Sequence, residues 1–407
     1  MIKLLGIARI EQLLLLFTFT LLFVDDLLKK EIRYEILFFF ITISAAMVLV
    51  SMNSSYEKID ENGYYIKFLL IYPAAFYVGA RILAKVNIKD IIYIFDFALL
   101  FYVVSWLIIM YVPLPDSLLH KVVHFREFGW GEEFLPLQGT FYEAGAIGII
   151  VGSALLFAVL MRYEFNIWPK DRRYLYLLYF LVLYMFLMSR NKTIWLTYTL
   201  ILLFLAFYKG YLLLSRSNYF YTDSLLNEDN VLRKFSKVNS GYLLFGAFLL
   251  IIIFFAYNTF SPTPFITMEE MQFKMEHERG AQFAVAWDLI EQSNYFGGYG
   301  YGFVEVYFEG LDILGVGAGS GSINNTVLNM WLQGSIIAVV YLSVLFYLGF
   351  NKRLFLTIST PLFFFFFGLT NPVTAEEFHL FLGLAYSFSS FVDDDKVYQK
   401  ILNGGYS

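Results

Sequence analysis

Long apolar runs, joined by short polar segments, make up most of the chain. Eleven of these runs approach the roughly twenty residues that a helix needs to cross a bilayer. Their apolar residues are continuous, whereas the strands of a membrane β-barrel alternate apolar and polar positions. The pattern therefore predicts an all-α polytopic membrane protein with about 11–12 transmembrane helices. The predicted spans are 11–24, 36–52, 64–84, 91–112, 141–161, 174–188, 191–208, 241–260, 323–349, 354–370 and 377–392.

One stretch of about sixty residues, 261–322, departs from this membrane pattern. Its run 279–291 predicts an amphipathic helix, because apolar residues recur at i, i+3, i+4 and i+7. These apolar residues are Phe283, Ala286, Trp287 and Ile290. A glycine-rich turn follows at 296–302, and a hydrophobic span begins again at 323. We expect a large, partly helical loop outside the membrane.

The chain is accordingly expected in three parts. Residues 1–260 hold the first eight spans, with an outer loop at 113–140 and a cytoplasmic loop at 209–240. Residues 261–322 form the large extracytoplasmic loop, and residues 323–407 hold the last three spans.

Composition agrees with a membrane protein. The chain of 407 residues is 59% hydrophobic, and only 15% of its residues are charged, against roughly a quarter in soluble domains. It has no cysteine, which excludes disulfides and thiolate metal sites. The net charge of −5 argues against a nucleic-acid partner.

Lysine and arginine predict the orientation of the spans. The connections after spans one, three, five, seven and nine, with the C-terminus, hold 19 of the 29 basic residues, so we expect them in the cytoplasm. The 261–322 loop is then outside, and it holds nine acidic residues and two basic ones. Lys3 and Arg9 disfavour the outer amino terminus that this orientation requires, which leaves open a twelfth span or a tilted first helix.

The basic residues on the predicted outer side need an explanation. Arg126 lies in the 113–140 loop, Arg190 and Lys192 in a very short turn, and Arg279 in the acidic loop. Such side chains can snorkel or pair with carboxylates. Alternatively, guanidinium groups bind phosphate oxygens bidentately. At the outer leaflet they would suit a lipid-linked phosphate or pyrophosphate.

Two acidic residues also lie close to predicted spans. Glu143 lies at the outer start of a span, where it either stabilises the helix N-terminus or faces a cavity at membrane level. Asp96 lies inside the fourth span, so we expect it to have a charged partner or a wet cavity.

The glycines and aromatic residues of the large loop give weaker signals. Gly298-x-Gly300-x-Gly302 lacks the preceding strand and following helix of a nucleotide loop, so it predicts a tight turn. Most Tyr and Trp residues are expected at the membrane interfaces. A few in outer loops are candidates for stacking on sugar rings, namely Trp130, Trp287, Tyr299 and Tyr301.

An ordered series of short motifs runs through the same regions. In the loop and the span after it, they are Arg279, Ala286-Trp287-Asp-Leu-Ile290, Asn294-x-Phe296-Gly297, Asn324-Asn325-Thr-Val-Leu328 and Gly334-Ser-Ile-Ile337. Earlier in the chain, they are Thr140-Phe-Tyr-Glu143-Ala-Gly145 and Ser189-Arg190. In this order the chain resembles the O-antigen polymerase and ligase superfamily of bacterial membrane glycosyltransferases. The resemblance implies a GT-C-like fold.

The resemblance also implies a reaction at the outer leaflet of the bacterial cytoplasmic (inner) membrane. An undecaprenyl-pyrophosphate-linked oligosaccharide would donate its glycan to a hydroxyl of another lipid-linked unit. The product would be a surface polysaccharide, O-antigen or capsule. No nucleotide sugar, cofactor or metal is implied. The implied partners are the lipid-linked donor and acceptor, the bilayer and a chain-length regulator protein.

Residue roles follow from the resemblance by position. Arg190 and Arg279 would hold the pyrophosphate and stabilise its charge on departure. The acceptor hydroxyl needs a general base. Glu143 is the first candidate and His277 the second, unless the arginines carry catalysis largely alone. The expected substrate-binding residues are Arg126, Lys192, Trp287, Tyr299, Asn324 and Asn325.

Two positions depart from the family pattern, and two other functions stay open. Asn324 stands where the ligases often have histidine, which favours a polymerase over a ligase acting on lipid A-core or protein. Ala144 replaces the family's proline. A flippase or transporter would need polar residues deep in many spans and related halves. Asp96 is one of few such residues, and the sequence shows no repeat.

Overall fold

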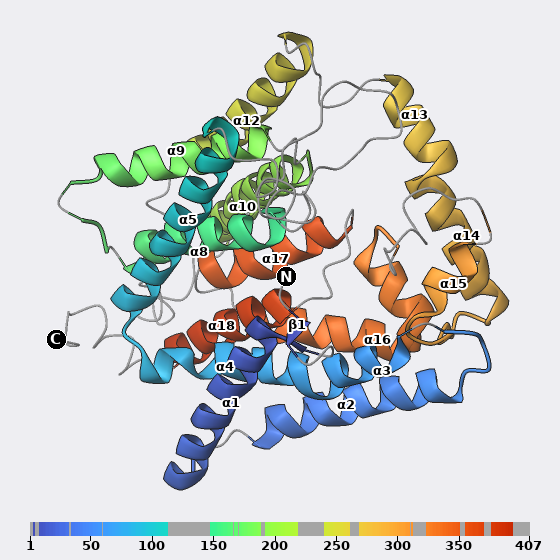
Figure 1. The fold of residues 1–407 in the computed structure, drawn as a ribbon. Helices are drawn as coiled ribbons and strands as arrows, with labels where there is room; N and C mark the ends of the chain where they lie inside the picture. The colour runs from blue at the N-terminus through green and yellow to red at the C-terminus, as the bar shows by residue number, and fades with distance from the viewer. Residues whose placement is uncertain are drawn as a thin grey trace. The chain divides into compact units, whose positions relative to one another are not determined.

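A computed structural model gives the arrangement of the chain. It describes residues 3–4, 8–31, 34–58, 60–112, 147–165, 167–169, 171–188, 192–218, 240–260, 268–309, 311, 323–350, 355–369 and 376–393. Figure 1 shows the fold of the chain. The contacts between residues divide it into two compact units. The division joins segments distant in sequence, because residues 268–350 belong with the first helices and the last one.

The first unit comprises residues 1–87, 268–350 and 368–407. It begins with a short antiparallel pair, in which Lys3 is opposite Arg9. The remaining elements are helical. The elements are β1 (Lys3–Leu4), β2 (Ala8–Arg9), α1 (Ile10–Lys29), α2 (Tyr34–Asn53), α3 (Glu61–Ile66), the π-helix η1 (Lys67–Ile71), α4 (Tyr72–Lys85), α13 (Met268–His277), α14 (Arg279–Gln292), α15 (Phe303–Glu309), α16 (Thr326–Gly349) and α18 (Glu376–Asp393).

The second unit comprises residues 88–267 and 351–367. Its described elements are all helical. They are α5 (Ile88–Tyr111), the π-helix η2 (Gly148–Gly152), α8 (Ser153–Phe165), α9 (Arg173–Met188), α10 (Lys192–Asn218), α12 (Ser240–Phe260) and α17 (Phe355–Gly368). Helix α5 packs on α8 and α9, and α10 packs on α12.

Four helical segments are long and apolar enough to cross a membrane by length and composition. They are Asn62–Lys85, Ile88–Ile108, Gly148–Phe165 and Thr326–Gly349. Shorter apolar helices also occur in the described residues. Each predicted span overlaps a helical segment in the described part of the chain. The structure is therefore compatible with a helical membrane protein, as the apolar runs predict.

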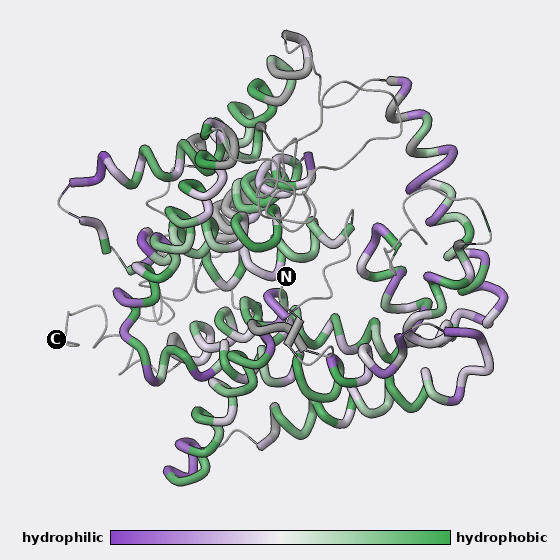
Figure 2. The backbone as a smooth tube through the Cα atoms, viewed as in Figure 1, coloured by the Kyte–Doolittle hydropathy of each residue, from purple (hydrophilic) through white to green (hydrophobic). Residues whose placement is uncertain are grey.

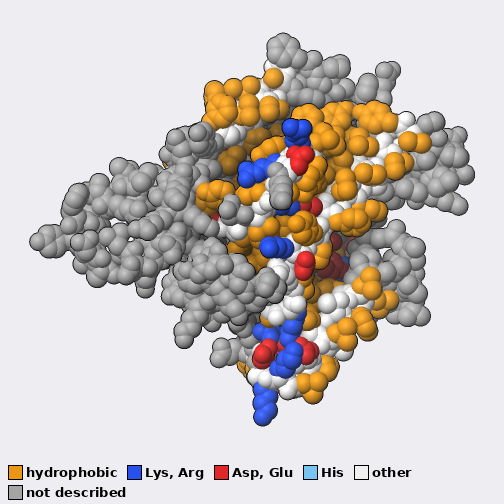
Figure 3. All heavy atoms as spheres, turned by 90° about the vertical axis from the view of Figure 1, so that its left-hand side faces the viewer, with side chains coloured by type: hydrophobic (Ala, Val, Ile, Leu, Met, Phe, Trp, Pro, Cys, Tyr) orange, Lys and Arg blue, Asp and Glu red, His pale blue; other side chains and the backbone are white. Residues whose placement is uncertain are grey.

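Apolar side chains also face outward in a way that a membrane would satisfy. Along α5, Ile94, Phe97, Phe101 and Ile108 are between 45% and 70% exposed and lie roughly on one face. Figure 2 shows α2 as largely hydrophobic, whereas α13 carries several hydrophilic positions. On the face drawn in Figure 3, charged side chains form small mixed groups and hydrophobic ones cover wide areas. Continuous exposed apolar surface of this kind is rare in soluble proteins.

Helices α4 and α18 pack most closely in the first unit. A Cβ added at Gly79 would lie 2.2 Å from the backbone oxygen of Leu380. One added at Gly383 would lie 2.2 Å from the oxygen of Phe76. Glycine at these positions lets the two backbones touch, as is common between membrane helices. Helices α2 and α16 complete this group, with α16 against both α2 and α18 (Figure 1).

Candidate functional site

Helix α16 is broken near its beginning. Ser335 has φ 68° and ψ −178°, which no helix accommodates, so the helix stops at Gly334 and restarts. The Ser335 hydroxyl accepts from the Ile337 amide and so caps the restarted part. Irregular backbone inside a membrane helix occurs where protein or a cavity covers it, often at substrate sites. The break therefore marks a candidate functional region.

The glycine-rich turn supplies the hydrogen bonds that the broken helix lacks. The amides of Gly298 and Tyr299 both donate to the oxygen of Leu332 at 2.9 Å. The amide of Gly300 donates to the oxygen of Gln333 at 3.0 Å. These helix carbonyls would otherwise be unsatisfied. The turn predicted from Gly298-x-Gly300-x-Gly302 is thus present, and it lies directly on the break.

Positive φ angles explain why this turn is built from glycine. Gly297, Gly298, Gly300 and Gly302 have φ between 68° and 103°, a region that costs other residues energy. At Gly297 a Cβ would also lie 2.2 Å from the oxygen of Trp331. The turn therefore needs glycine both for its conformation and for its close approach to α16.

The end of α2 holds the other side of the turn. The Ser51 hydroxyl accepts from the Tyr301 amide at 2.9 Å, and the Ser54 hydroxyl donates to the Tyr299 oxygen. The ammonium of Lys58 donates to the backbone oxygens of Ser51 and Ser54 at 2.7 and 3.1 Å. Lysine at a helix C-terminus interacts favourably with these carbonyls. Helix α2, the turn and α16 thus form one hydrogen-bonded assembly.

Helix α14 covers this assembly through an apolar cluster. Its Ala286 and Ile290 pack with Phe303, Phe308 and Ile323, all nearly buried. The cluster holds α14 against the elements on either side of the turn.

Arg279 is the first residue of α14. Its Nε lies 4.0 Å from the Glu278 carboxylate, and about a third of the side chain is exposed. That contact is at the outer limit for an ion pair, and the anion-binding role of Arg279 stays a prediction. One turn further on, the side-chain oxygen of Gln282 accepts from the backbone amide of Asn324 at 3.2 Å. The helix that Arg279 begins is thus hydrogen-bonded to the backbone of Asn324, just before α16.

The other predicted site residues have different surroundings. Asn325 is the N-cap of α16, where its carbonyl accepts from the Leu328 amide and its amide donates to the Leu369 oxygen. Tyr299 is buried, with its hydroxyl on the Leu289 oxygen, and burial raises its pKa. Both side chains therefore have structural roles, and the Tyr299 ring has no open face for a sugar.

Trp287 and His277 lie at the surface. The Trp287 side chain is 42% exposed, and its ring nitrogen donates to the Glu291 carboxylate at 2.6 Å. His277 ends α13 with 59% of its side chain exposed. Lys192 begins α10 in the second unit. Arg126, Glu143 and Arg190 lie outside the described residues, so their predicted roles stay predictions.

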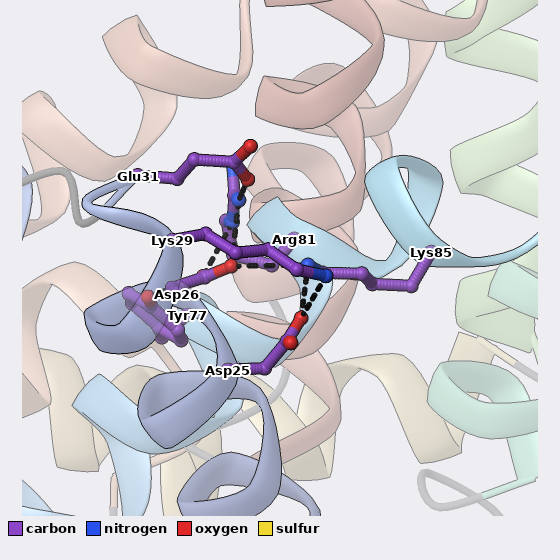
Figure 4. A network of polar contacts seen from close by, with 7 residues as sticks. All are labelled: Asp25, Asp26, Lys29, Glu31, Tyr77, Arg81 and Lys85. Carbon is purple, nitrogen blue, oxygen red and sulfur yellow. Dashed lines mark hydrogen bonds and ion pairs between the residues drawn. The ribbon is translucent and has the colours of Figure 1, made fainter.

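An ion-pair network that the sequence analysis did not single out joins α1 to α4 (Figure 4). Arg81 donates from Nε and Nη2 to Asp26 at 2.6 and 2.7 Å, and from Nη2 to Glu31 at 2.9 Å. Tyr77 donates to Asp26 at 2.6 Å, and Lys85 lies 3.3 Å from it. Asp26 is fully buried. Bidentate geometry and several donors make such a buried carboxylate tolerable.

Electrostatics explain the charge state of this network. Burial would raise the pKa of Asp26, but the hydrogen bonds from Arg81 and Tyr77 outweigh it, so its pKa is lowered. The pKa of Asp25 is also lowered, chiefly by its hydrogen bond from Lys85 and then by that from Lys29. Three carboxylates face three cations, so the network is neutral. It fixes helices together and offers no net charge to a ligand.

Asp96, for which the sequence predicts a charged partner or a wet cavity, forms a second buried ion pair. In the second unit, its carboxylate accepts from Arg162, whose side chain is only 1% exposed. Arg162 also donates to the Ile167 oxygen at 2.9 Å. The predicted charged partner of Asp96 is thus found, and it comes from α8.

His379 lies in the interior of the first unit. Its Nε2 is 2.9 Å from the Tyr341 hydroxyl, and its ring stacks on Tyr72 with centroids 4.3 Å apart. All three side chains are at most 3% exposed. A histidine so enclosed has a structural role in cross-linking α4, α16 and α18.

Comparisons with known proteins give no relative. No protein-family model, no curated protein and no solved structure matches the chain. Among the described residues, no group of three or more potential ligands would hold a metal ion. The function must therefore be argued from the residues themselves.

Proposed function

We propose that the chain is a polymerase of lipid-linked oligosaccharides. It would join undecaprenyl-pyrophosphate-linked repeat units into a surface polysaccharide at the outer leaflet of the bacterial inner membrane. The proposal includes the 11–12 spans, the GT-C-like fold and the outward orientation of the 261–322 loop, all inferred from the sequence. The observation that supports it is that α14, which begins at Arg279, packs against the broken helix α16 and is hydrogen-bonded through Gln282 to the backbone of Asn324.

The proposed reaction needs a cation beside the donor's pyrophosphate, because the negative charge on this group increases as it leaves. The acceptor hydroxyl oxygen forms a bond to the anomeric carbon of the donor, and the bond from that carbon to the pyrophosphate oxygen breaks. The leaving lipid pyrophosphate gains negative charge, which Arg279 would stabilise. Arg279 opens α14, whose N-terminus adds partial positive charge at the same place.

The proton of the acceptor hydroxyl must go to a base. His277, exposed at the end of α13 and two residues before Arg279, is the candidate among the described residues. Glu143 is the other candidate from the sequence. Asn324 is suited to orient a hydroxyl, because an amide both donates and accepts hydrogen bonds but takes up no proton.

A strain that lacks the gene, complemented with variants, tests the proposal. We expect Arg279→Ala to reduce surface glycan to single repeat units while membrane expression is unchanged. Loss of one charge-stabilising contact costs about 2–4 kcal/mol in the transition state, or a rate reduction of about thirty- to a thousandfold. Arg173→Ala is the matched control, since Arg173 begins α9 in the second unit.

The deletion strain separates the alternatives. Single lipid-linked units at the outer leaflet support the polymerase. Long lipid-linked polymer that is never transferred would contradict it and indicate a ligase. Accumulation of units on the cytoplasmic leaflet would contradict it and indicate a flippase.

A further inference from the structure

Three aromatic side chains form a partly exposed surface where α14 and α16 meet. The ring centroid of Trp287 is 6.1 Å from that of Trp331, with the ring planes at 85°. It is 6.3 Å from that of Tyr295, with the planes at 65°. Trp287 and Tyr295 are 42% and 53% exposed. We call Trp287, Tyr295 and Trp331 the aromatic platform.

Polar contacts fix the orientation of the platform. The Trp331 ring nitrogen donates to the Tyr295 oxygen at 3.0 Å, and the Trp287 ring nitrogen donates to Glu291 at 2.6 Å. The indole donors are thus both used within the protein. The two indole rings are held in place and present apolar surface.

Backbone strain at Tyr295 indicates that its ring is needed there. Asn294 and Tyr295 have φ of 54° and 63°. Asparagine tolerates this left-handed region, but a bulky aromatic residue there is an outlier. Glycine would suit the backbone of this helix end better. Strained residues of this kind concentrate at functional sites.

The charges around the platform favour a sugar over a lipid surface as its occupant. Asp288 and Glu291 are exposed on the same helix as Trp287. The whole 261–322 segment has nine acidic and two basic residues. A helix that lies on a lipid surface is typically rich in Lys and Arg, which attract anionic head groups. Acidic surroundings repel those head groups, whereas carboxylates accept hydrogen bonds from sugar hydroxyls.

We infer that the aromatic platform is a carbohydrate-binding subsite of this protein. A neutral sugar ring would stack on Trp287 and Tyr295, with Asp288 and Glu291 accepting from its hydroxyls. The inference rests on the proposed function, because it takes the bound sugar to belong to the glycan being extended. Trp287 lies on the same helix as Arg279, about two turns further on, so the platform would hold sugar units beyond the reacting one.

Direct binding tests the subsite without using catalysis. The full-length protein, purified in lipid nanodiscs, is titrated calorimetrically with repeat-unit oligosaccharide released by mild acid from the strain's own surface polysaccharide. We expect Trp287→Ala and Tyr295→Gly each to weaken binding by about tenfold or more, as for a central aromatic contact. Tyr295→Gly is the sharper variant, since it should unfold at an equal or higher temperature than the wild type. Tyr347→Ala, which removes an aromatic ring that is 77% exposed near the other end of α16, should bind normally.

The outcomes separate this inference from the proposed function. Because the probe has no pyrophosphate, Arg279→Ala should bind it normally even though it makes short glycans. Absence of oligosaccharide binding to the folded wild-type protein would overturn the subsite, whatever the glycan length. So would undiminished binding by Tyr295→Gly, or Trp287 fluorescence quenched by brominated lipid and unaffected by oligosaccharide. If oligosaccharide binding depends on the platform but a strain without the gene still makes long glycans, the subsite is supported and the polymerase function is contradicted.

Discussion

Replacing Asp26 with asparagine tests how the buried network holds α1 to α4. The change removes the carboxylate that accepts two hydrogen bonds from Arg81 and one from Tyr77. Breaking a buried ion pair from one side costs about 3–5 kcal/mol, because the remaining charge is left buried. Arg81 keeps Glu31, and Lys85 is partly exposed, so some compensation remains. We therefore expect the lower end of that range, about 3 kcal/mol.

The assay is the temperature at which half of the detergent-purified protein loses its monodisperse peak in size-exclusion chromatography. Large membrane proteins unfold irreversibly, so this midpoint, measured at one heating time, replaces an equilibrium free energy. Asp26→Asn should lower the midpoint by several degrees. Asp25→Asn, a matched change at a carboxylate that is 39% exposed, should have a much smaller effect.

A double variant checks the physical reason. Asp26→Leu combined with Arg81→Met removes both charges and should recover most of the lost stability, since apolar replacement of a buried pair is often neutral. An unchanged midpoint in Asp26→Asn would show that the buried network does not stabilise the packing of α1 on α4. Equal losses in the double variant and in Asp26→Asn would show that shape, and not the unpaired charge, causes the effect.

Three further predictions concern packing and charge. Gly383→Ala should disrupt the α4–α18 contact, because its Cβ would lie 2.2 Å from the Phe76 oxygen, whereas Gly246→Ala, with its nearest neighbour at 3.5 Å, should be tolerated; expression and thermal midpoints check both. Asp96→Asn should lower the thermal midpoint by an amount corresponding to about 3 kcal/mol, because Arg162 is left buried; an unchanged midpoint would contradict this. Acid should destabilise the wild type through Asp26, because folding lowers the pKa of this carboxyl group. Its contribution to stability is complete above the pKa of the unfolded chain, about 4, and is lost as the pH falls through the pKa of the folded protein. The thermal midpoints of the wild type and Asp26→Asn should therefore converge as the pH falls through that range.

Much of the helical structure could be predicted from the sequence. Continuous apolar runs leave a helix as the only way to satisfy the backbone in a membrane, so the runs predict the helices. The amphipathic run 279–291 is found as α14 at Arg279–Gln292. Of the four residues on its predicted apolar face, Ala286 and Ile290 are buried and Phe283 is half-buried, whereas Trp287 is exposed.

The break in α16 could not be predicted from the same pattern. Gly334-Ser335 lies inside an apolar run without proline, and nothing local requires the helix to stop. The break is stable because amides of the distant turn at 298–300 satisfy its carbonyls. Such a non-local exchange of hydrogen bonds leaves no periodicity in the sequence.

The roles of individual residues could also be predicted only in part. The motif predicts substrate binding for Asn325, but asparagine just before a helix is also a common N-cap, and the structure shows it as the N-cap of α16. The ion pair of Asp26 with Arg81 could have been predicted from the sequence. Opposite charges end the first span and the third, and both ends were expected on one side of the membrane.

Chain extension by the purified protein is the decisive measurement of polymerase activity. The protein in lipid vesicles is given undecaprenyl-pyrophosphate-linked repeat units as donor and acceptor, and product length is read by gel electrophoresis. We expect polymer of several repeat units from the wild type, without nucleotide sugar. We expect strongly reduced extension with Arg279→Ala and normal extension with Arg173→Ala. Failure of the folded wild type to extend these units, or equal extension by Arg279→Ala, would contradict the proposed function.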